Sequence, residues 1–295
     1  MQKKLYVLCL MIVLCGGLVG CADSSIEADF NTDTTERNDS TIAADNFYET
    51  AITEYLAAKE FVEGENIKLD IAISDAEELV QSDRSVLDNA CILTLQKTIL
   101  DAKATKFVVE EMPDETDDIL LAIDALNAVN YSDIIGNLVG HSENLQESQM
   151  QFALVDAPSE EYIIACLEEV PSIIAIESVT EFNDQNGMLN TDGGYTAQIF
   201  FASDFVNQTL VKGTSAIEKG TAGGGSIEVY ATQEDALNRN AYLEELDDTS
   251  LDTGSHTVIG TVLVRTSKTL NAEQQEELEQ FIITALTDLD GAVTS

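Results

Sequence analysis

The chain has 295 residues, of which 54 are acidic and only 14 are basic, so its net charge is −40 at pH 7. Such a surface repels nucleic acid and anionic lipid headgroups, which excludes nucleic acid as a partner and favours cations, cationic peptides or basic proteins. Apolar residues make up 44% of the chain, as in an ordinary globular protein with one large domain or two smaller ones.

The first twenty residues are typical of a secretory signal peptide. Lys3 and Lys4 precede an apolar run from Leu5 to Leu14, which is shorter than the roughly 20 residues needed to span a bilayer. The following Leu18–Cys21 resembles the lipobox of bacterial lipoproteins: an aliphatic residue, a small pair and a cysteine. This resemblance implies that Cys21 becomes the first mature residue, carries a diacylglyceryl group on its sulfur and holds the protein on the extracytoplasmic face of the cell membrane. The alternative is an ordinary signal peptide, or a short transmembrane anchor, with a chance cysteine.

Residues 21–44 are polar and have few apolar side chains to bury, which predicts a disordered tether. Between residues 45 and 153, apolar residues recur at helical spacing. We expect one long helix over 45–82, or two nearly collinear helices that meet at Gly64. A second helix is expected over 86–104, followed by a short third and a fourth that ends near Phe152. Each helix has one apolar stripe and one acidic face, which predicts an antiparallel helical bundle over 45–153.

The pattern changes to shorter elements at Pro158. Ser159 can cap a helix, and Thr232 and Asn271 can cap two later ones, the last with Gln274 in a capping box. Strands are expected at 173–182, 195–201, 226–230 and 256–265. The order α-β-β-β-α-β-α predicts an α+β domain over 155–288, with a small sheet covered on one face by helices, and a tail over 289–295. Residues 226–265 form a candidate βαβ unit, which would be right-handed if its strands are parallel.

Five segments of this region carry a family resemblance: Glu181–Gly187, Gly193–Ala197, Gly225–Thr232, Gly254–Val258 and Val264–Ser267. They resemble segments shared by a group of uncharacterised lipoproteins from Gram-positive Firmicutes of the clostridial kind. The resemblance covers roughly residues 155–288 and extends more loosely through the helical part. It implies the same location and architecture, and it carries no catalytic residue over to this chain.

The turn Asp184-x-Asn186-Gly187 matches half of a calcium-binding loop. The full motif also needs an acid where Phe182 stands and a glutamate where Gly193 stands. A plain hairpin turn is therefore the alternative interpretation. A non-standard calcium site would use four side chains: Glu181, Asp184, Asn186 and Asp192.

Cys91 and Cys166 are the two cysteines that follow Cys21. Outside the cytoplasm they could form a disulfide with each other. Each could instead be a buried thiol that packs as a small apolar side chain.

The sequence contains weak hints of catalysis and no complete motif. Gly220–Gly225 precedes a strand rather than a helix, which favours a close backbone approach over a phosphate cradle. Asp252, Ser255 and His256 suggest a hydrolase, but adjacent residues of a strand point to opposite faces. His141 has no second histidine near it for a zinc site. Arg265 is expected at an exposed strand end, in a salt bridge with acidic neighbours.

We therefore expect an extracytoplasmic, lipid-anchored protein that is not an enzyme and acts as a cell-surface binding module for a protein, peptide or cationic ligand. One alternative is a structural envelope lipoprotein whose helices act as a spacer or associate with themselves. Another is a hydrolase with an unrecognised site. We expect no cofactor, apart from calcium at the Asp184 turn.

Overall fold

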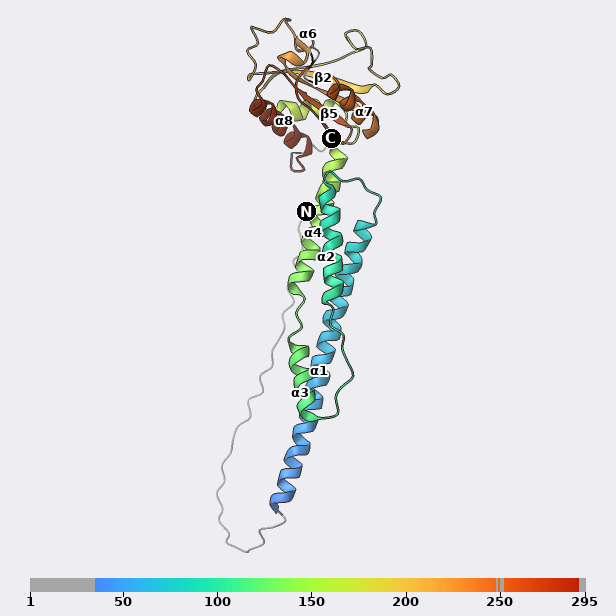
Figure 1. Ribbon diagram of the computed structural model, residues 1–295, viewed down its shortest axis with the longest axis vertical. Helices are drawn as coiled ribbons and strands as arrows, with labels where there is room; N and C mark the ends of the chain where they lie inside the picture. Colours follow the sequence, from blue (N-terminus) through green and yellow to red (C-terminus); the bar gives the residue numbers. More distant parts are fainter. Residues whose placement is uncertain (1–34, 248, 250–251, 292–295) are drawn as a thin grey trace, which may run out of the picture. The chain divides into compact units, whose positions relative to one another are not determined.

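The computed structural model describes residues 35–247, 249 and 252–291 (Figure 1). Contacts divide the chain into two units, residues 1–54 and residues 55–295. The second unit holds every element described below except the first turns of α1. The predicted signal peptide, Cys21 and most of the predicted tether lie outside the described residues.

The first part of the chain folds into four helices: α1 (Thr35–Val80), α2 (Asn89–Thr105), α3 (Thr116–Asn127) and α4 (Ser132–Leu154). α1 begins earlier than predicted, inside the segment expected to be a tether, and it continues through Gly64 without a break. A glycine inside a helix costs about 1 kcal/mol relative to alanine. Complete burial of Val62 and Leu69 on either side of Gly64 outweighs this cost.

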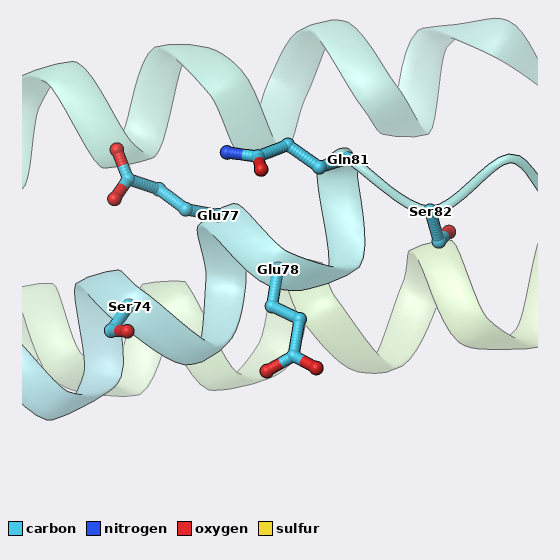
Figure 2. Close-up of a pocket in the computed structure, with 5 residues that line it drawn as sticks. All are labelled: Ser74, Glu77, Glu78, Gln81 and Ser82. Carbon is cyan, nitrogen blue, oxygen red and sulfur yellow. The ribbon is translucent and has the colours of Figure 1, made fainter.

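α2 runs antiparallel to both α1 and α4, as predicted for a helical bundle. Asp70 and Glu77 of α1 pair with Lys106 and Lys103 at the end of α2, in opposite sequence order. Contacts between α2 and α4 are also in opposite sequence order. Ser82, just after α1 (Figure 2), accepts a hydrogen bond from Gln149 of α4 at 3.0 Å. The three helices share a core of buried apolar side chains: Leu69, Ile73, Ala76, Leu95, Ile99, Ala102, Leu138 and Leu145.

Within the described residues, the stretch Thr116–Leu154 is long and apolar enough to cross a membrane by length and composition alone. It contains two helices, because α3 ends at Asn127 and α4 begins at Ser132. Core helices of soluble proteins pass the same test, so the stretch is weak evidence for a membrane span.

The second part of the chain is an antiparallel sheet of five strands in the order β1-β2-β3-β5-β4. This confirms the predicted α+β class. The strands are β1 (Ile173–Ser178), β2 (Tyr195–Ser203), β3 (Gly224–Tyr230), β4 (His256–Ile259) and β5 (Val262–Thr266). The helices are α5 (Glu160–Glu168), α6 (Ala216–Lys219), the 3-10 turn η1 (Gly220–Gly223), α7 (Gln233–Glu244) and α8 (Ala272–Thr287).

The single strand predicted over 256–265 is wrong, because the chain reverses in its middle. Gly260, with a φ of +59°, and Thr261 form the turn between β4 and β5. β3 and β4 are both antiparallel to β5, so they run in the same direction with β5 between them. The candidate βαβ unit is therefore present with parallel strands, but those strands are not neighbours.

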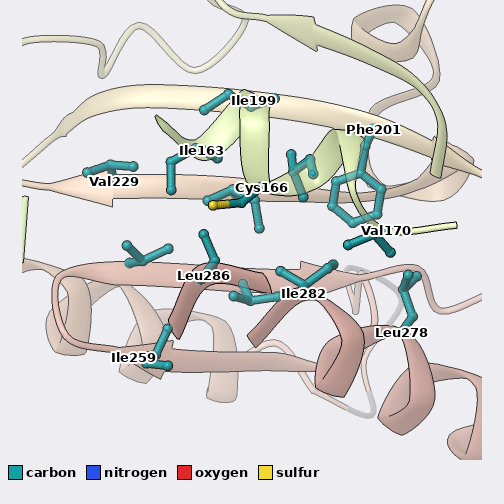
Figure 3. Packing of buried hydrophobic residues seen from close by; sticks show 14 of the residues in the cluster. Ile163, Cys166, Val170, Ile199, Phe201, Val229, Ile259, Leu278, Ile282 and Leu286 are labelled. Carbon is teal, nitrogen blue, oxygen red and sulfur yellow. The ribbon is translucent and has the colours of Figure 1, made fainter. Parts of the chain in front are cut away.

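Helices cover both faces of the sheet, and the prediction of one covered face is wrong. On one face, α5 and α8 pack on apolar side chains of the strands, including Ile199, Phe201 and Val229 (Figure 3). On the other face, α7 packs on Tyr195, Tyr230 and Leu263. Every residue of β3 is buried, because this central strand is covered from both sides.

The predicted helix caps are confirmed. Ser159 accepts a hydrogen bond from the backbone N–H of Tyr162, and Thr232 accepts one from Asp235. Asn271 and Gln274 form the predicted capping box at the start of α8. Each cap satisfies N–H groups that have no partner inside their helix.

The end of α4 is hydrogen-bonded to the turn between β4 and β5. The carbonyl of Val155 accepts bonds from the backbone N–H of Thr261 at 2.9 Å and from its hydroxyl at 3.1 Å. The same hydroxyl accepts a bond from the N–H of Ala157 at 2.7 Å. We call these contacts of residues 155–157 with Gly260 and Thr261 the α4–sheet junction.

Candidate functional site

A charged cluster is buried between the sheet and α7. Glu228 of β3 is 0% exposed, and its carboxylate binds two arginines. Arg265 of β5 donates from Nη1 to Oε1 at 2.7 Å, and Arg239 of α7 donates from Nε to Oε2 at 3.2 Å. The hydroxyl of Tyr230 donates to Oε2 at 2.7 Å, and Gln198 of β2 donates to Oε1 at 3.3 Å. The cluster joins three strands to the helix that covers them.

The chemistry of this cluster favours a structural role. Burial alone would raise the pKa of Glu228, but the two guanidinium groups outweigh burial and hold this pKa below its usual range. Burial and the neighbouring carboxylate raise the pKa of Tyr230. An acid or base catalyst needs a pKa near the working pH. The pKa of Glu228 is lowered and that of Tyr230 is raised, so both move further from neutral pH. Glu228 therefore stays ionised and Tyr230 stays protonated.

Sequence reasoning missed most of this cluster. Arg265 was expected at an exposed strand end, but only 6% of it is exposed, and Thr266 beside it is buried as well. The predicted salt bridge of Arg265 with an acidic residue is confirmed, and its partner is Glu228. The sequence did contain a signal for this ion pair. One apolar strand has a carboxylate in its middle, in Ile227-Glu228-Val229, and another has an arginine, in Val264-Arg265.

The residues that suggested a hydrolase are not brought together. Asp252 accepts a bond from the N–H of Gly254, and Ser255 donates to Glu279 of α8. The ring of His256 is bonded to Asn240 at 2.8 Å and lies 3.4 Å from Asp247. His141 is bonded to Thr98 in the helical bundle. In the part of the chain that the structure describes, no hydrogen bond joins any two of Asp252, Ser255 and His256.

Asp184 binds its own loop. One carboxylate oxygen accepts bonds from the N–H of Asn186 at 3.0 Å and from the hydroxyl of Tyr195, and the other accepts a bond from the N–H of Leu189 at 2.9 Å. A cation at this turn would compete with these donors. Over the described residues, no group of three or more His, Cys, Asp or Glu side chains is placed to hold a metal ion. A calcium site that uses Asp184 and Asn186, with Glu181 and Asp192, stays a prediction.

The structure does not pair Cys91 with Cys166, and both are free. Cys91 lies on α2, where its Sγ is 4.0 Å from the carboxylate of Asp88. Cys166 lies on α5 and packs in the core of the sheet domain (Figure 3). The alternative of two buried thiols agrees with the structure for Cys166, whereas Cys91 is only partly buried. Burial raises the pKa of both thiols, which disfavours the thiolate.

The glycine run allows a close approach of backbones. A Cβ on Gly224 would lie 2.6 Å from the backbone nitrogen of Ser203, and one on Gly225 would lie 2.2 Å from the carbonyl oxygen of Arg265. Only glycine fits at these two positions at the start of β3. The interpretation of this run as a strand entry agrees with the structure.

Among the described residues, at least four surface recesses of about 420 to 510 Å³ are large enough to hold a small ligand, and two of them contain consecutive glutamates at helix ends. The first of these two lies at the end of α1 and measures about 490 Å³. Its two carboxylates, Glu77 and Glu78, point away from each other (Figure 2), and Glu77 already pairs with Lys103. This recess therefore offers no convergent binding groups.

The second recess lies between the ends of α5 and α8 and measures about 510 Å³. We call it the α5–α8 recess. Three exposed carboxylates line it, those of Glu168, Glu169 and Asp288, and the residues that line it include no basic side chain. Its other lining residues are Tyr162, Ala165, Cys166, Ala285 and Gly291. The hydroxyl of Tyr162 donates to the carbonyl of Leu286 at 2.9 Å, which fixes the ring between the two helices. Such a recess suits a cation with an apolar body.

Fold and sites together define an α+β protein in which an antiparallel helical bundle precedes a five-stranded antiparallel sheet. In comparisons with known proteins, no family model, no curated protein and no solved structure matches the chain. The resemblance to lipoproteins of Firmicutes therefore stays a prediction.

Proposed function

We propose that this protein is an extracytoplasmic, lipid-anchored binding module that engages cationic groups of a ligand or basic segments of a partner protein. The observation that carries the binding proposal is the α5–α8 recess of about 510 Å³, which is lined by three carboxylates and no basic side chain. The net charge of −40 favours the same partners, because it attracts cations at long range.

The anchoring part of the proposal rests on the sequence around Cys21. A basic tip, a short apolar run and Leu18–Cys21 follow one another as in a lipoprotein signal peptide. Two or three acyl chains on Cys21 would give firm attachment, since each buried methylene contributes roughly 0.8 kcal/mol.

Replacing the carboxylates of the α5–α8 recess is expected to weaken cation binding. In Glu168→Gln/Asp288→Asn, the affinity of the detergent-solubilised full chain for an oligolysine peptide should fall about tenfold, since two charge-assisted contacts are lost. Calorimetric titration measures the affinity. The matched control is Glu160→Gln/Glu161→Gln, which removes two charges from the start of the same helix, away from the recess. Equal losses of affinity in both variants would contradict binding in the recess. They would show that only the net charge of the protein attracts the peptide.

Cys21→Ala is expected to abolish membrane attachment. The wild-type protein should enter the detergent phase and incorporate labelled fatty acid, because the thiol of Cys21 is the lipid acceptor in this proposal. Cys15→Ala is the matched control, since Cys15 lies in the leader that would be removed. Detergent partitioning that is the same for Cys21→Ala and the wild type would disprove the anchor.

A structural, self-associating lipoprotein is the second candidate function. The observation that favours it is the set of exposed apolar side chains on the helices: Leu93 and Leu100 are each 66% exposed, Ile67 is 60% exposed and Ile71 is 56% exposed. Sedimentation separates the two candidates. Association that depends on concentration and disappears in Leu93→Ser/Leu100→Ser would favour the structural role.

A further inference from the structure

β1 is an edge strand, and its pairing with β2 decides which backbone groups face outward. The N–H of Val179 donates to the carbonyl of Gln198 at 2.8 Å, which sets the phase of the antiparallel ladder. Alternate residues, 175 and 177, therefore bond to β2. Ile176 and Ser178 lie at the positions between them and direct their N–H and C=O groups away from the sheet.

The edge of β1 is poorly protected. Within the described part of the chain, no backbone group pairs with the outer edge of β1, which ends the strand order. Natural edges are commonly blocked by lysine or proline, and the sequence of β1, Ile-Ile-Ala-Ile-Glu-Ser, contains neither. Ile174 is 56% exposed beside these free groups. A register shift between residues 173 and 175 disturbs only the start of the strand.

The opposite edge of the sheet is better protected. β4 has only four residues, against six in β1. The ring of His256, at the start of β4, is bonded to Asn240 of α7 and lies against Asp247. Short edges and covering segments are the usual protections against strand addition.

The charge around β1 selects the occupant. Glu168 and Glu169 precede the strand and Glu181 follows it, all three exposed. A second copy of the chain would bring the same carboxylates and a second net charge of −40 against this edge. A basic segment would meet opposite charges at both ends of β1. Repeating outward N–H and C=O groups are satisfied by an extended backbone.

We propose that the outer edge of β1 accepts an extended, basic polypeptide segment of a partner protein as a sixth strand of the sheet. This inference rests on the proposed function, because it assigns a second contact to the basic partner. The α5–α8 recess would bind cationic side chains, whereas β1 binds backbone. Glu168 and Glu169 supply charge to both contacts, so the two are separated by changing backbone N–H groups while the charges stay the same.

The test uses the detergent-solubilised full chain and a peptide of alternating lysine and valine as the probe. Ser178→Pro removes one outward N–H that the β1–β2 ladder does not use, and Ser178→Ala keeps that N–H. We expect Ser178→Pro to weaken peptide binding about tenfold and Ser178→Ala to leave it unchanged. Unchanged thermal midpoints in both variants establish that the sheet is intact.

A second probe removes dependence on the proline variant. The same peptide, N-methylated at every residue, keeps every charge but has no backbone N–H left to donate to an edge strand, and it should bind the wild-type protein about tenfold more weakly. Equal binding of the two peptides would overturn the β1 inference. The proposed function would still stand if Glu168→Gln/Asp288→Asn weakens both peptides. If neither peptide binds, both proposals are refuted. Dimerisation lost in Ser178→Pro would instead assign the edge to a second copy and overturn the basic partner.

Discussion

Glu228→Gln is expected to lower the free energy of unfolding by about 3–5 kcal/mol, which is a large part of the stability of an ordinary domain. The substitution keeps the shape of the side chain but removes its charge. Arg265 and Arg239 then remain largely buried without a counter-charge, since their side chains are only 8% and 15% exposed. Denaturant unfolding, read as the change in midpoint at constant slope, measures the loss.

Two comparisons make this prediction specific. Glu181→Gln removes the same charge from an exposed position and should change stability by less than about 0.5 kcal/mol. In a double-mutant cycle with Arg265→Met, the double variant should lose less unfolding free energy than the two single variants lose in sum. The reason is that each single variant leaves an uncompensated buried charge. Additive losses would contradict a coupled ion pair at the centre of the sheet.

The pH dependence follows from the lowered pKa of Glu228 in the folded state. A carboxyl group with a lowered pKa contributes stability above its unfolded pKa, about 4.3, and loses that contribution as the pH falls through the folded value. The difference in stability between the wild type and Glu228→Gln should therefore be constant near neutral pH. It should narrow in acid, below about pH 4.

Local signals explain which elements were predictable. Ser159, Thr232 and Asn271 each lie directly before a helix, and a cap acts through a residue two or three positions away in the chain. The apolar stripes of α2 and α4 likewise repeat within each helix. Such features appear in a short window of sequence, so most helices and strands were predicted near their true positions, whereas the short α6 was not predicted.

Features that depend on distant residues were not predictable from one sequence. The reversal at Gly260 lies inside an apolar alternation that reads as one strand, and its turn is stabilised by Val155, far away in the chain. Glu228 and Arg265 meet only because β3 and β5 are neighbours, which the strand order decides. The α5–α8 recess combines side chains from two helices that are distant in the sequence.

Gly260→Ala is expected to destabilise the protein by about 2–5 kcal/mol, because two costs add at the α4–sheet junction. The φ of +59° disfavours any residue with a Cβ by about 1–2 kcal/mol. The new Cβ would also lie 2.4 Å from the carbonyl oxygen of Val155, the acceptor for Thr261, and relief of such a clash costs about 1–3 kcal/mol more.

Gly187→Ala separates the two costs. Gly187 has nearly the same backbone angle, a φ of +65°, but no atom lies within 4 Å of the position its Cβ would take. This control should lose only about 1–2 kcal/mol, the cost of the left-handed conformation. The difference between the two variants then measures the contact between α4 and the sheet, and thermal and denaturant unfolding of both gives it directly. Equal losses of stability in the two variants would mean that the α4–sheet junction accommodates the new Cβ without an energetic cost. The attachment of the bundle would then not depend on the β4–β5 turn.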